Sequence, residues 1–243
     1  MELSKRLQAV ADLVTAGYII ADVGTDHAYV PICLVREGRI PCAIASDVNI
    51  GPLERAREHV CENGLEDKID LRISNGFSAI SPGEVQSAVI AGMGGGLMMR
   101  ILTEGAETVR ELAECILQPQ SEIEKVRTFL LQEGFLFLDE VMVEEDGKFY
   151  TAMKVSPEIG RDKAAEKPQI KRACWNEAEL RYGKLLLEKK DPVLKRFLER
   201  ELQIKKEILT SLEGRGSERI EQRRAELKEE IEYARKGMEY YAL

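Results

Sequence analysis

Strand-like and helix-like segments alternate between residues 3 and 155 of this 243-residue chain, and the alternation decides its fold class. Strands are predicted where Val, Ile and Ala gather, at residues 18–23, 42–47, 69–74, 88–91 and 115–118. Helical periodicity predicts helices at residues 3–14, 30–37, 52–63, 97–104, 108–112 and 123–132. Strands separated by helices pair in parallel through right-handed crossovers. We therefore predict an α/β fold with a doubly wound sheet.

A hairpin completes the predicted sheet. Two alternating runs, at residues 135–144 and 149–155, flank the segment Glu145-Asp146-Gly147-Lys148. An Asp-Gly pair between such runs is typical of a tight β-turn. The sheet then has seven strands, which fits the Rossmann-like sheet of class I methyltransferases better than the six-stranded dehydrogenase sheet. This comparison is an analogy between folds.

The composition changes after Ser156, where Pro157 and Gly160 lead into a tail rich in Lys, Arg and Glu. Because linkers of this kind separate domains, we predict one domain at residues 1–156 and a helical arm at residues 161–243.

The arm has the pattern of two helices. Asp191 and Pro192 suit a helix start, and residues 213–217 form a Gly-containing turn. The first apolar stripe is Leu194, Leu198, Leu202, Leu209 and Leu212. The second is Ile220, Leu227, Ile231, Ala234 and Met238. An antiparallel helical hairpin or short coiled coil is therefore predicted.

The charge is unevenly distributed. The whole chain carries −8, but residues 1–156 hold 14 Lys+Arg against 25 Asp+Glu, a net of −11. Residues 157–243 hold 21 against 18, a net of +3. A segregated basic segment is compatible with a nucleic-acid partner, which the total charge alone would argue against.

Several classes of protein are disfavoured by the sequence. Apolar runs are too short for a membrane span, and the start MELSKRLQAVADLV lacks the apolar core of a signal peptide. The five cysteines are scattered and form no C-x-x-C pair, so neither a metal site nor a disulfide framework is predicted. We expect a cytoplasmic protein without membrane or metal partners.

The first predicted strand ends in Gly24-Thr25-Asp26-His27-Ala28-Tyr29. In an open α/β sheet this end of the strand borders the ligand crevice. One glycine is fewer than the three of a dinucleotide-binding G-x-G-x-x-G motif, so pyrophosphate binding is poorly supported. Gly24 beside acidic and polar side chains suits a zwitterionic amino-acid group better, although a plain strand-to-helix turn has the same pattern.

The second and third strands also end in polar residues. Asp47, about twenty residues after the glycine turn, can accept hydrogen bonds from both ribose hydroxyls of a nucleoside. Val48 follows it. The third strand leads into Asn75 and Gly76, where an amide side chain can meet an adenine amino group, although Asn-Gly is also a common turn.

The fourth strand opens into Gly92-Met93-Gly94-Gly95-Gly96. Four glycines in five positions are expected where the backbone approaches a ligand closely. Gln118 and Pro119 follow the fifth strand at the same rim, and either line a substrate pocket or form a proline turn.

The segments LSKRL, ADVGTDHAYVP, ASDVNIGPLERA, ISNGF, AVIAGMGGG, LQPQ and EDGKFY together resemble the bacterial tRNA (adenine-22-N1)-methyltransferase family. The resemblance covers nearly the whole chain and is strongest over residues 3–155, whereas the tail matches only in helical character. It implies a class I fold with a C-terminal coiled-coil arm, S-adenosyl-L-methionine as cofactor and tRNA as partner.

The resemblance also implies roles for matching positions. Those expected at the cofactor are Gly24, Asp26, His27, Asp47, Val48, Asn75, Gly76, Gly92, Met93 and Gly94. Asp26 and His27 are also the catalytic candidates, although Asp26 suits the cofactor ammonium equally well and His27 suits a structural role. Further positions are expected at the tRNA on other grounds. Lys5, Arg6, Lys195, Arg196 and Arg200, with Lys205 and Lys206 as further arm candidates, can contact phosphates, through which folded RNA is largely bound. Tyr29, Gly95, Gln118 and Pro119 are the candidates on the substrate side of the crevice.

The chain lacks the Asn/Asp-Pro-Pro-Tyr/Phe motif of amino-group methyltransferases, so a ring nitrogen is the more consistent target. Two alternatives stay open. One is a methyltransferase of a small molecule or protein, in which the hairpin mediates dimerisation. The other is a nucleotide-binding interaction module without catalysis.

Overall fold

The computed structural model describes residues 2–157, 175–212 and 217–242. The chain divides into two compact units, residues 1–173 and residues 174–243, which are described separately. The predicted domain boundary at residues 156–161 and most of the predicted turn at residues 213–217 fall largely outside the described residues.

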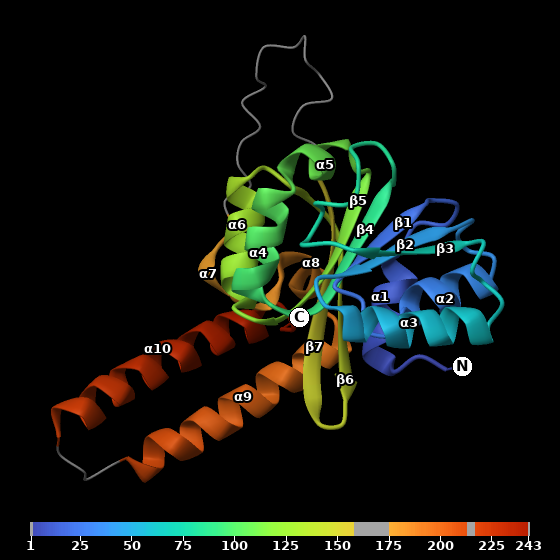
Figure 1. Cartoon of the computed structure of the whole chain (residues 1–243). Helices are drawn as coiled ribbons and strands as arrows, with labels where there is room; N and C mark the ends of the chain where they lie inside the picture. Colours follow the sequence, from blue (N-terminus) through green and yellow to red (C-terminus); the bar gives the residue numbers. More distant parts are fainter. Residues whose placement is uncertain (1, 158–174, 213–216, 243) are drawn as a thin grey trace, which may run out of the picture. The chain divides into compact units, whose positions relative to one another are not determined.

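The first unit is built on one seven-stranded sheet with the order β3-β2-β1-β4-β5-β7-β6 (Figure 1). Strands β1 to β5 pair in parallel, and β7 is antiparallel to both β5 and β6. The strands are β1 (Ile20–Val23), β2 (Ala43–Asp47), β3 (Ile69–Ile73), β4 (Ser87–Gly94), β5 (Glu114–Ser121), β6 (Leu136–Glu145) and β7 (Lys148–Ser156). The predicted α/β class and strand number are confirmed.

Helices cover both faces of the sheet. One core cluster contains buried residues of α4 (Gly95–Glu104), α5 (Ala106–Glu111) and α6 (Ile123–Gln132). The other contains residues of α1 (Lys5–Leu13), α2 (Tyr29–Arg36) and α3 (Ile50–Glu62). As predicted, no helix connects β3 to β4, because residues 74–86 form only turns. The β3 end of the sheet therefore depends on a loop for part of its cover.

Strand β4 extends beyond its predicted end. We expected a strand over residues 88–91 followed by a glycine loop, whereas β4 continues to Gly94. The reason is pairing with β5: Met93 lies opposite Pro119 and Gly94 opposite Ser121, with register shifts on both sides of Met93. The glycine segment is thus an irregular strand end that leads directly into α4.

The hairpin of β6 and β7 turns as its sequence predicts. Glu145 pairs with Lys148, so Asp146 and Gly147 alone form the loop, and their φ angles are 50° and 71°. Two central residues with positive φ define a type I′ turn, for which Asp-Gly is favoured.

The second unit is helical, as expected, and its long helices α9 (Pro192–Ser211) and α10 (Glu218–Glu239) are antiparallel. Leu198 lies against Gly237, and Lys205 pairs with Glu230. Asp191 caps α9 through bonds to the N–H groups of residues 193 and 194. Two short helices, α7 (Glu177–Tyr182) and α8 (Lys184–Glu188), were not predicted because they are too short to show a period.

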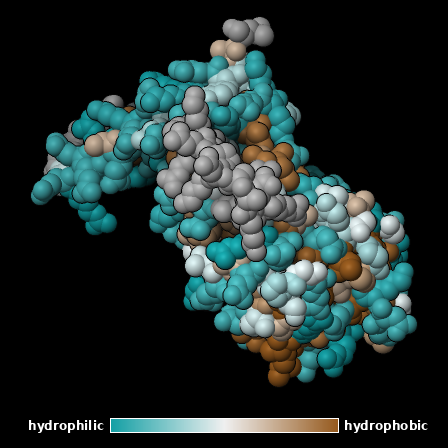
Figure 2. Space-filling model, turned by 90° about the horizontal axis from the view of Figure 1, so that it is seen from above, coloured by the Kyte–Doolittle hydropathy of each residue, from teal (hydrophilic) through white to brown (hydrophobic). Residues whose placement is uncertain are grey.

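Hydrophilic residues cover most of the surface visible in Figure 2, and hydrophobic residues appear there in small separate groups. Among the described helices, none has the length and apolar character that a membrane crossing requires.

Candidate active site

A cavity of about 350 Å³ lies at the carboxyl ends of β1 and β4. This volume is within the range of small-ligand sites. Six predicted site residues line it, namely Arg6, Gly24, Asp26, His27, Tyr29 and Gly92. The remaining lining residues are Leu7, Asp22, Thr25, Ala28, Val30 and Ala91. The first and fourth strand ends therefore meet at one site, as the sequence predicts, whereas Asp47, Asn75 and Gly76 from the second and third strand ends do not line this cavity.

Gly24 makes the turn after β1 with φ of 80°, a conformation that favours glycine. Its N–H donates to the Ser46 carbonyl of β2 at 2.8 Å. The side chain of Met93 occupies the space in which a Cβ at position 24 would lie. The two glycine-containing segments are thus in direct contact.

Asp22 is a cavity residue that sequence reasoning did not select. It lies within the buried strand β1, is 8% exposed, and faces the cavity beside Thr25. Burial raises the pKa of Asp22 to about 6, the Thr25 hydroxyl opposes this rise by a hydrogen bond, and the charge of Asp47 adds to it. A buried carboxyl at a cavity wall is suited to bind a cationic ligand group, because such a group would stabilise its ionised form. An acidic residue inside an otherwise apolar strand was the available signal.

Asp26 points to the outer rim. Its carboxylate forms an ion pair with Arg55 of α3, in which Nε lies 3.2 Å from Oδ1, and its Oδ2 lies 3.4 Å from Nε2 of His27. The Asp26 side chain is 63% exposed. Its negative charge is therefore already partly balanced within the protein.

The only two histidines of the chain lie together beside this rim. The rings of His27 and Tyr29 stack with centroids 4.8 Å apart and an interplanar angle of 6°. The ring of His59 lies 5.1 Å from both. His59 Nδ1 is 3.3 Å from the carbonyl oxygen of His27. Stacking fixes the His27 ring and presents one edge of it toward Asp26.

Asp47 and Val48 lie at the end of β2, where the sequence predicts a ribose site. Asp47 Oδ1 accepts from the Asn49 N–H at 2.7 Å, which leaves the second carboxylate oxygen for a ligand. Val48 is 59% exposed, and Ile73, at the end of the neighbouring strand β3, is 60% exposed. Two exposed apolar side chains beside an acidic one suit a nucleoside, which has a flat base and a polar sugar.

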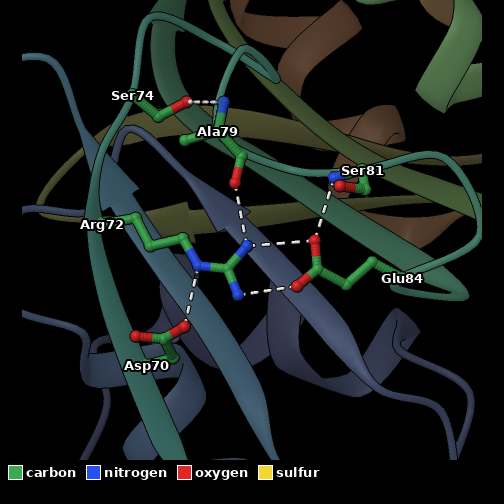
Figure 3. Close-up of polar contacts among 6 residues, drawn as sticks. All are labelled: Asp70, Arg72, Ser74, Ala79, Ser81 and Glu84. Atoms are coloured by element: carbon green, nitrogen blue, oxygen red, sulfur yellow. Dashed lines mark hydrogen bonds and ion pairs between the residues drawn. The ribbon is translucent and has the colours of Figure 1, made fainter.

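Asn75 and Gly76 lie in the loop after β3, which a polar network fixes (Figure 3). The guanidinium of Arg72 donates to Asp70 at 2.7 Å, to the Ala79 carbonyl at 2.8 Å and to both carboxylate oxygens of Glu84 at 2.6 and 3.0 Å. Ser74 Oγ donates to the Gly76 carbonyl and accepts from the Ala79 N–H. The loop that replaces a crossover helix is thereby held at both of its ends.

Side chains from the end of β5 hold the glycine segment. The N–H of Gly92 donates to Gln118 Oε1 at 3.2 Å and that of Gly96 to Glu122 Oε2 at 3.1 Å. Gly95 is buried, and a Cβ there would lie 2.6 Å from the Ser121 carbonyl oxygen. Packing of α4 on β5 therefore explains Gly95, whereas Gly92 and Gly94 are exposed at the rim.

The residues of the first unit that were predicted to contact tRNA differ in their exposure and contacts. Gln118 and Pro119 are buried and do not line the cavity. The Lys5 side chain is exposed, and the backbone N–H of Lys5 donates to Glu145 at 2.6 Å. Arg6 reaches the cavity wall, where it contacts Gln118 and Tyr150.

In the second unit, Lys195, Arg196, Arg200 and Lys206 are exposed on α9. Lys205 differs, because its side chain is only 15% exposed and pairs with Glu201 and Glu230. Lys205 therefore joins the two long helices.

The sheet order, its antiparallel seventh strand and the acidic cavity at the end of its first strand define a Rossmann-like methyltransferase. A family model described as tRNA (adenine(22)-N(1))-methyltransferase matches residues 20–236. The chain belongs to this family, and the resemblance noted in the sequence is confirmed.

Similar proteins agree with this assignment. The tRNA (adenine(22)-N(1))-methyltransferase of Bacillus subtilis strain 168 is 32% identical over 241 residues, which cover 99% of this chain and 98% of the relative. The crystal structure of the B. subtilis m1A22 tRNA methyltransferase matches with a TM-score of 0.78 and 32% identity, over 98% of this chain and 99% of that chain. A Streptococcus pneumoniae Sp1610 structure in complex with S-adenosyl-L-methionine matches with a TM-score of 0.81 and 33% identity, over 98% and 100%. The expected cofactor is thus that of the family.

Proposed function

We propose that this protein transfers a methyl group from S-adenosyl-L-methionine to N1 of adenine 22 in tRNA. Family membership across residues 20–236 carries the proposal, and the cavity formed by Gly24, Asp26 and Gly92 supplies a site for it. Because the proposed substrate is tRNA, we also propose that the protein acts in the cytoplasm.

The residues at the cavity fit the cofactor. Asp22 and Asp26, beside the Gly24 turn and His27, suit the ammonium of its methionine part. Asp47 suits the ribose hydroxyls. The exposed side chain of Val48 and the loop carrying Asn75 and Gly76 suit the adenine ring. Gly92, Met93 and Gly94 then separate cofactor from target base.

The bound cofactor supplies an electrophilic methyl group on a sulfonium. Neutral adenine N1 already has a lone pair, so no proton has to leave before methyl transfer. The protein can therefore act mainly by aligning the two reactants, an effect worth up to roughly 7–11 kcal/mol. The methylated ring is cationic until it loses an N6 proton, so nearby carboxylates stabilise it. Asp26, oriented by His27, is the proposed group for this role.

The remaining predicted contacts concern the RNA backbone. Lys5 in the first unit and Lys195, Arg196 and Arg200 in the second are exposed cations, and phosphate contacts supply most of the affinity in RNA recognition by shape. Tyr29 lies on the cavity wall, where an aromatic ring suits contact with a base.

Nucleotide mapping tests the proposal. Purified protein is incubated with labelled S-adenosyl-L-methionine and unmodified tRNA, and the methylated position is located by reverse transcription and mass spectrometry. We expect 1-methyladenine at position 22 and no incorporation into the same tRNA with guanine at that position. Methylation elsewhere, or of proteins or small molecules only, would refute the proposal.

A further inference from the structure

The side-chain amide of Gln118 lies behind the cavity wall and connects three segments. Gln118 is 1% exposed, so it cannot touch a ligand in the cavity. Its Oε1 accepts from Arg6 Nη1 at 3.1 Å, from the Gly92 N–H at 3.2 Å and from Gln120 Nε2 at 2.9 Å. Its Nε2 donates to the Pro119 carbonyl at 3.2 Å. The amide thus ties α1 to the end of β4.

Arg6 is held in the wall by these contacts. Besides Gln118, its guanidinium lies over the Tyr150 ring, 5.7 Å from the centroid, and its Nη1 lies 3.6 Å from the position of a Cβ at Gly92. Within residues 2–157, no carboxylate lies close enough to Arg6 to form an ion pair. Its direct partners are a neutral amide and a ring, so no contact neutralises its charge, although Asp22 and Asp26 line the same cavity.

The chemistry of the reaction indicates which ligand group this cation meets. A guanidinium has only donors, and it binds phosphate in a planar, two-pronged geometry. Contact with the target ring would be unfavourable, because methylation at N1 makes that ring cationic. A phosphate beside the target adenine therefore fits better than the base.

We propose that Gln118 is a positioning residue that holds Arg6 at the cavity so that Arg6 binds a phosphate group next to the target adenine. This inference rests on the proposed function. Gln118 acts through Arg6, and it does not touch the tRNA. The neutrality of Gln118 matters, because a carboxylate there would hold Arg6 equally well but would balance its charge.

A double-mutant cycle tests the inference in the full-length protein, with kcat/KM for tRNA and the Kd of S-adenosylhomocysteine as readouts. We expect Arg6→Ala to lower kcat/KM about 10- to 100-fold and Gln118→Leu about tenfold. In the Arg6→Ala background, Gln118→Leu should change kcat/KM less than twofold. The Kd of S-adenosylhomocysteine should stay within threefold throughout. Arg6→Lys should recover part of the activity.

Two further variants distinguish an effect of the Arg6 charge from a general loss of structure around the cavity. Gln118→Glu keeps an acceptor for Arg6 and Gly92 but adds a compensating charge, so its kcat/KM should also fall about tenfold. Arg36→Ala removes an exposed cation of α2 and should stay within twofold of wild type.

Three results would overturn the inference, provided that the wild-type protein methylates tRNA. They are multiplicative losses of kcat/KM in the double variant, a parallel loss of S-adenosylhomocysteine affinity, and full activity of Gln118→Glu. A wild-type protein without tRNA activity would instead refute the proposed function, and the inference with it.

Discussion

The methyl end of Met93 lies over Gly24, in the space that any side chain at position 24 would need. The first and fourth strands therefore approach each other closely, and a side chain at position 24 would have to displace Met93. Both Gly24 and Gly92 also have φ angles near 80°, a conformation that favours glycine.

Gly24→Ala should destabilise the protein and abolish cofactor binding. The positive φ alone costs about 1–2 kcal/mol for a residue with a Cβ, and displacement of Met93 adds to that cost. Gly83→Ala is the matched control, since Gly83 has φ of 77° and open space around it. Thermal unfolding and titration with S-adenosylhomocysteine measure both effects. Equal destabilisation in the two variants would show that the contact with Met93 is irrelevant.

Asp22 should make stability depend on pH. Its pKa is about 6 in the folded protein against 3.8 for the free group, so the folded state binds the proton more tightly. Stability is then full below about pH 4 and falls as the pH rises to about 6. The total loss is about 3 kcal/mol, because a tenfold difference in proton affinity is worth about 1.4 kcal/mol.

Denaturant titrations of Asp22→Asn and wild type from pH 4 to pH 7 measure this effect. The variant should gain stability relative to wild type as the pH rises. Asp67→Asn, at an exposed position, should not. A difference between Asp22→Asn and wild type that stays constant over this range would contradict the assignment.

Asp47→Ala should weaken S-adenosylhomocysteine binding about 10- to 100-fold, because hydrogen bonds from two ribose hydroxyls to a carboxylate are lost. Calorimetry gives the affinity. Glu54→Ala removes an exposed carboxylate from the following helix and should leave the affinity within twofold. Unchanged affinity in Asp47→Ala would place the ribose elsewhere.

Arg72→Ala should loosen the loop that carries Asn75 and Gly76. Loss of the bonds to Asp70, Ala79 and Glu84 should cost about 1–3 kcal/mol of stability and lower cofactor affinity severalfold. Hydrogen exchange of residues 74–84 should rise in parallel. Arg110→Ala, at an exposed position of α5, serves as the control and should change neither property.

Replacement of Lys195, Arg196 and Arg200 together by Ala should raise KM for tRNA without changing cofactor affinity. Each lost phosphate contact should also reduce the slope of log affinity against log salt by about 0.7–0.9. Three exposed cations of α10, replaced in the same way, form the control set: Arg219, Lys228 and Arg235. An equal effect of both triple variants would show that α9 is not the specific contact.

Periodicity predicted the α/β order well because the helices of the first unit each bury one apolar face, whereas its central strands are short continuous apolar runs buried on both faces. It failed where a residue's role depends on a distant partner. Asp22 was overlooked because it lies inside the buried strand β1, whose other residues belong to the core. Gly95 was assigned to a ligand because composition alone does not distinguish a glycine that packs against Ser121 from one that faces a cavity.

In the arm, too, the sequence pattern did not show which charged residues form ion pairs. Lys205 and Lys206 are neighbours in sequence and were grouped together, but Lys205 pairs with Glu230 of α10 whereas Lys206 is exposed. The pairing depends on the register of two antiparallel helices, which the heptad-like pattern does not specify at single-residue precision.

The contact between Arg6 and Gln118 joins residues 112 positions apart. During synthesis, α1 is among the first segments to leave the ribosome, yet the wall that it completes exists only after β5 has emerged. Strands β1 to β4, which carry the proposed cofactor residues, precede β5 in the chain. A nascent chain that stops short of β5 therefore carries most of the proposed cofactor residues but lacks the side chain that holds Arg6.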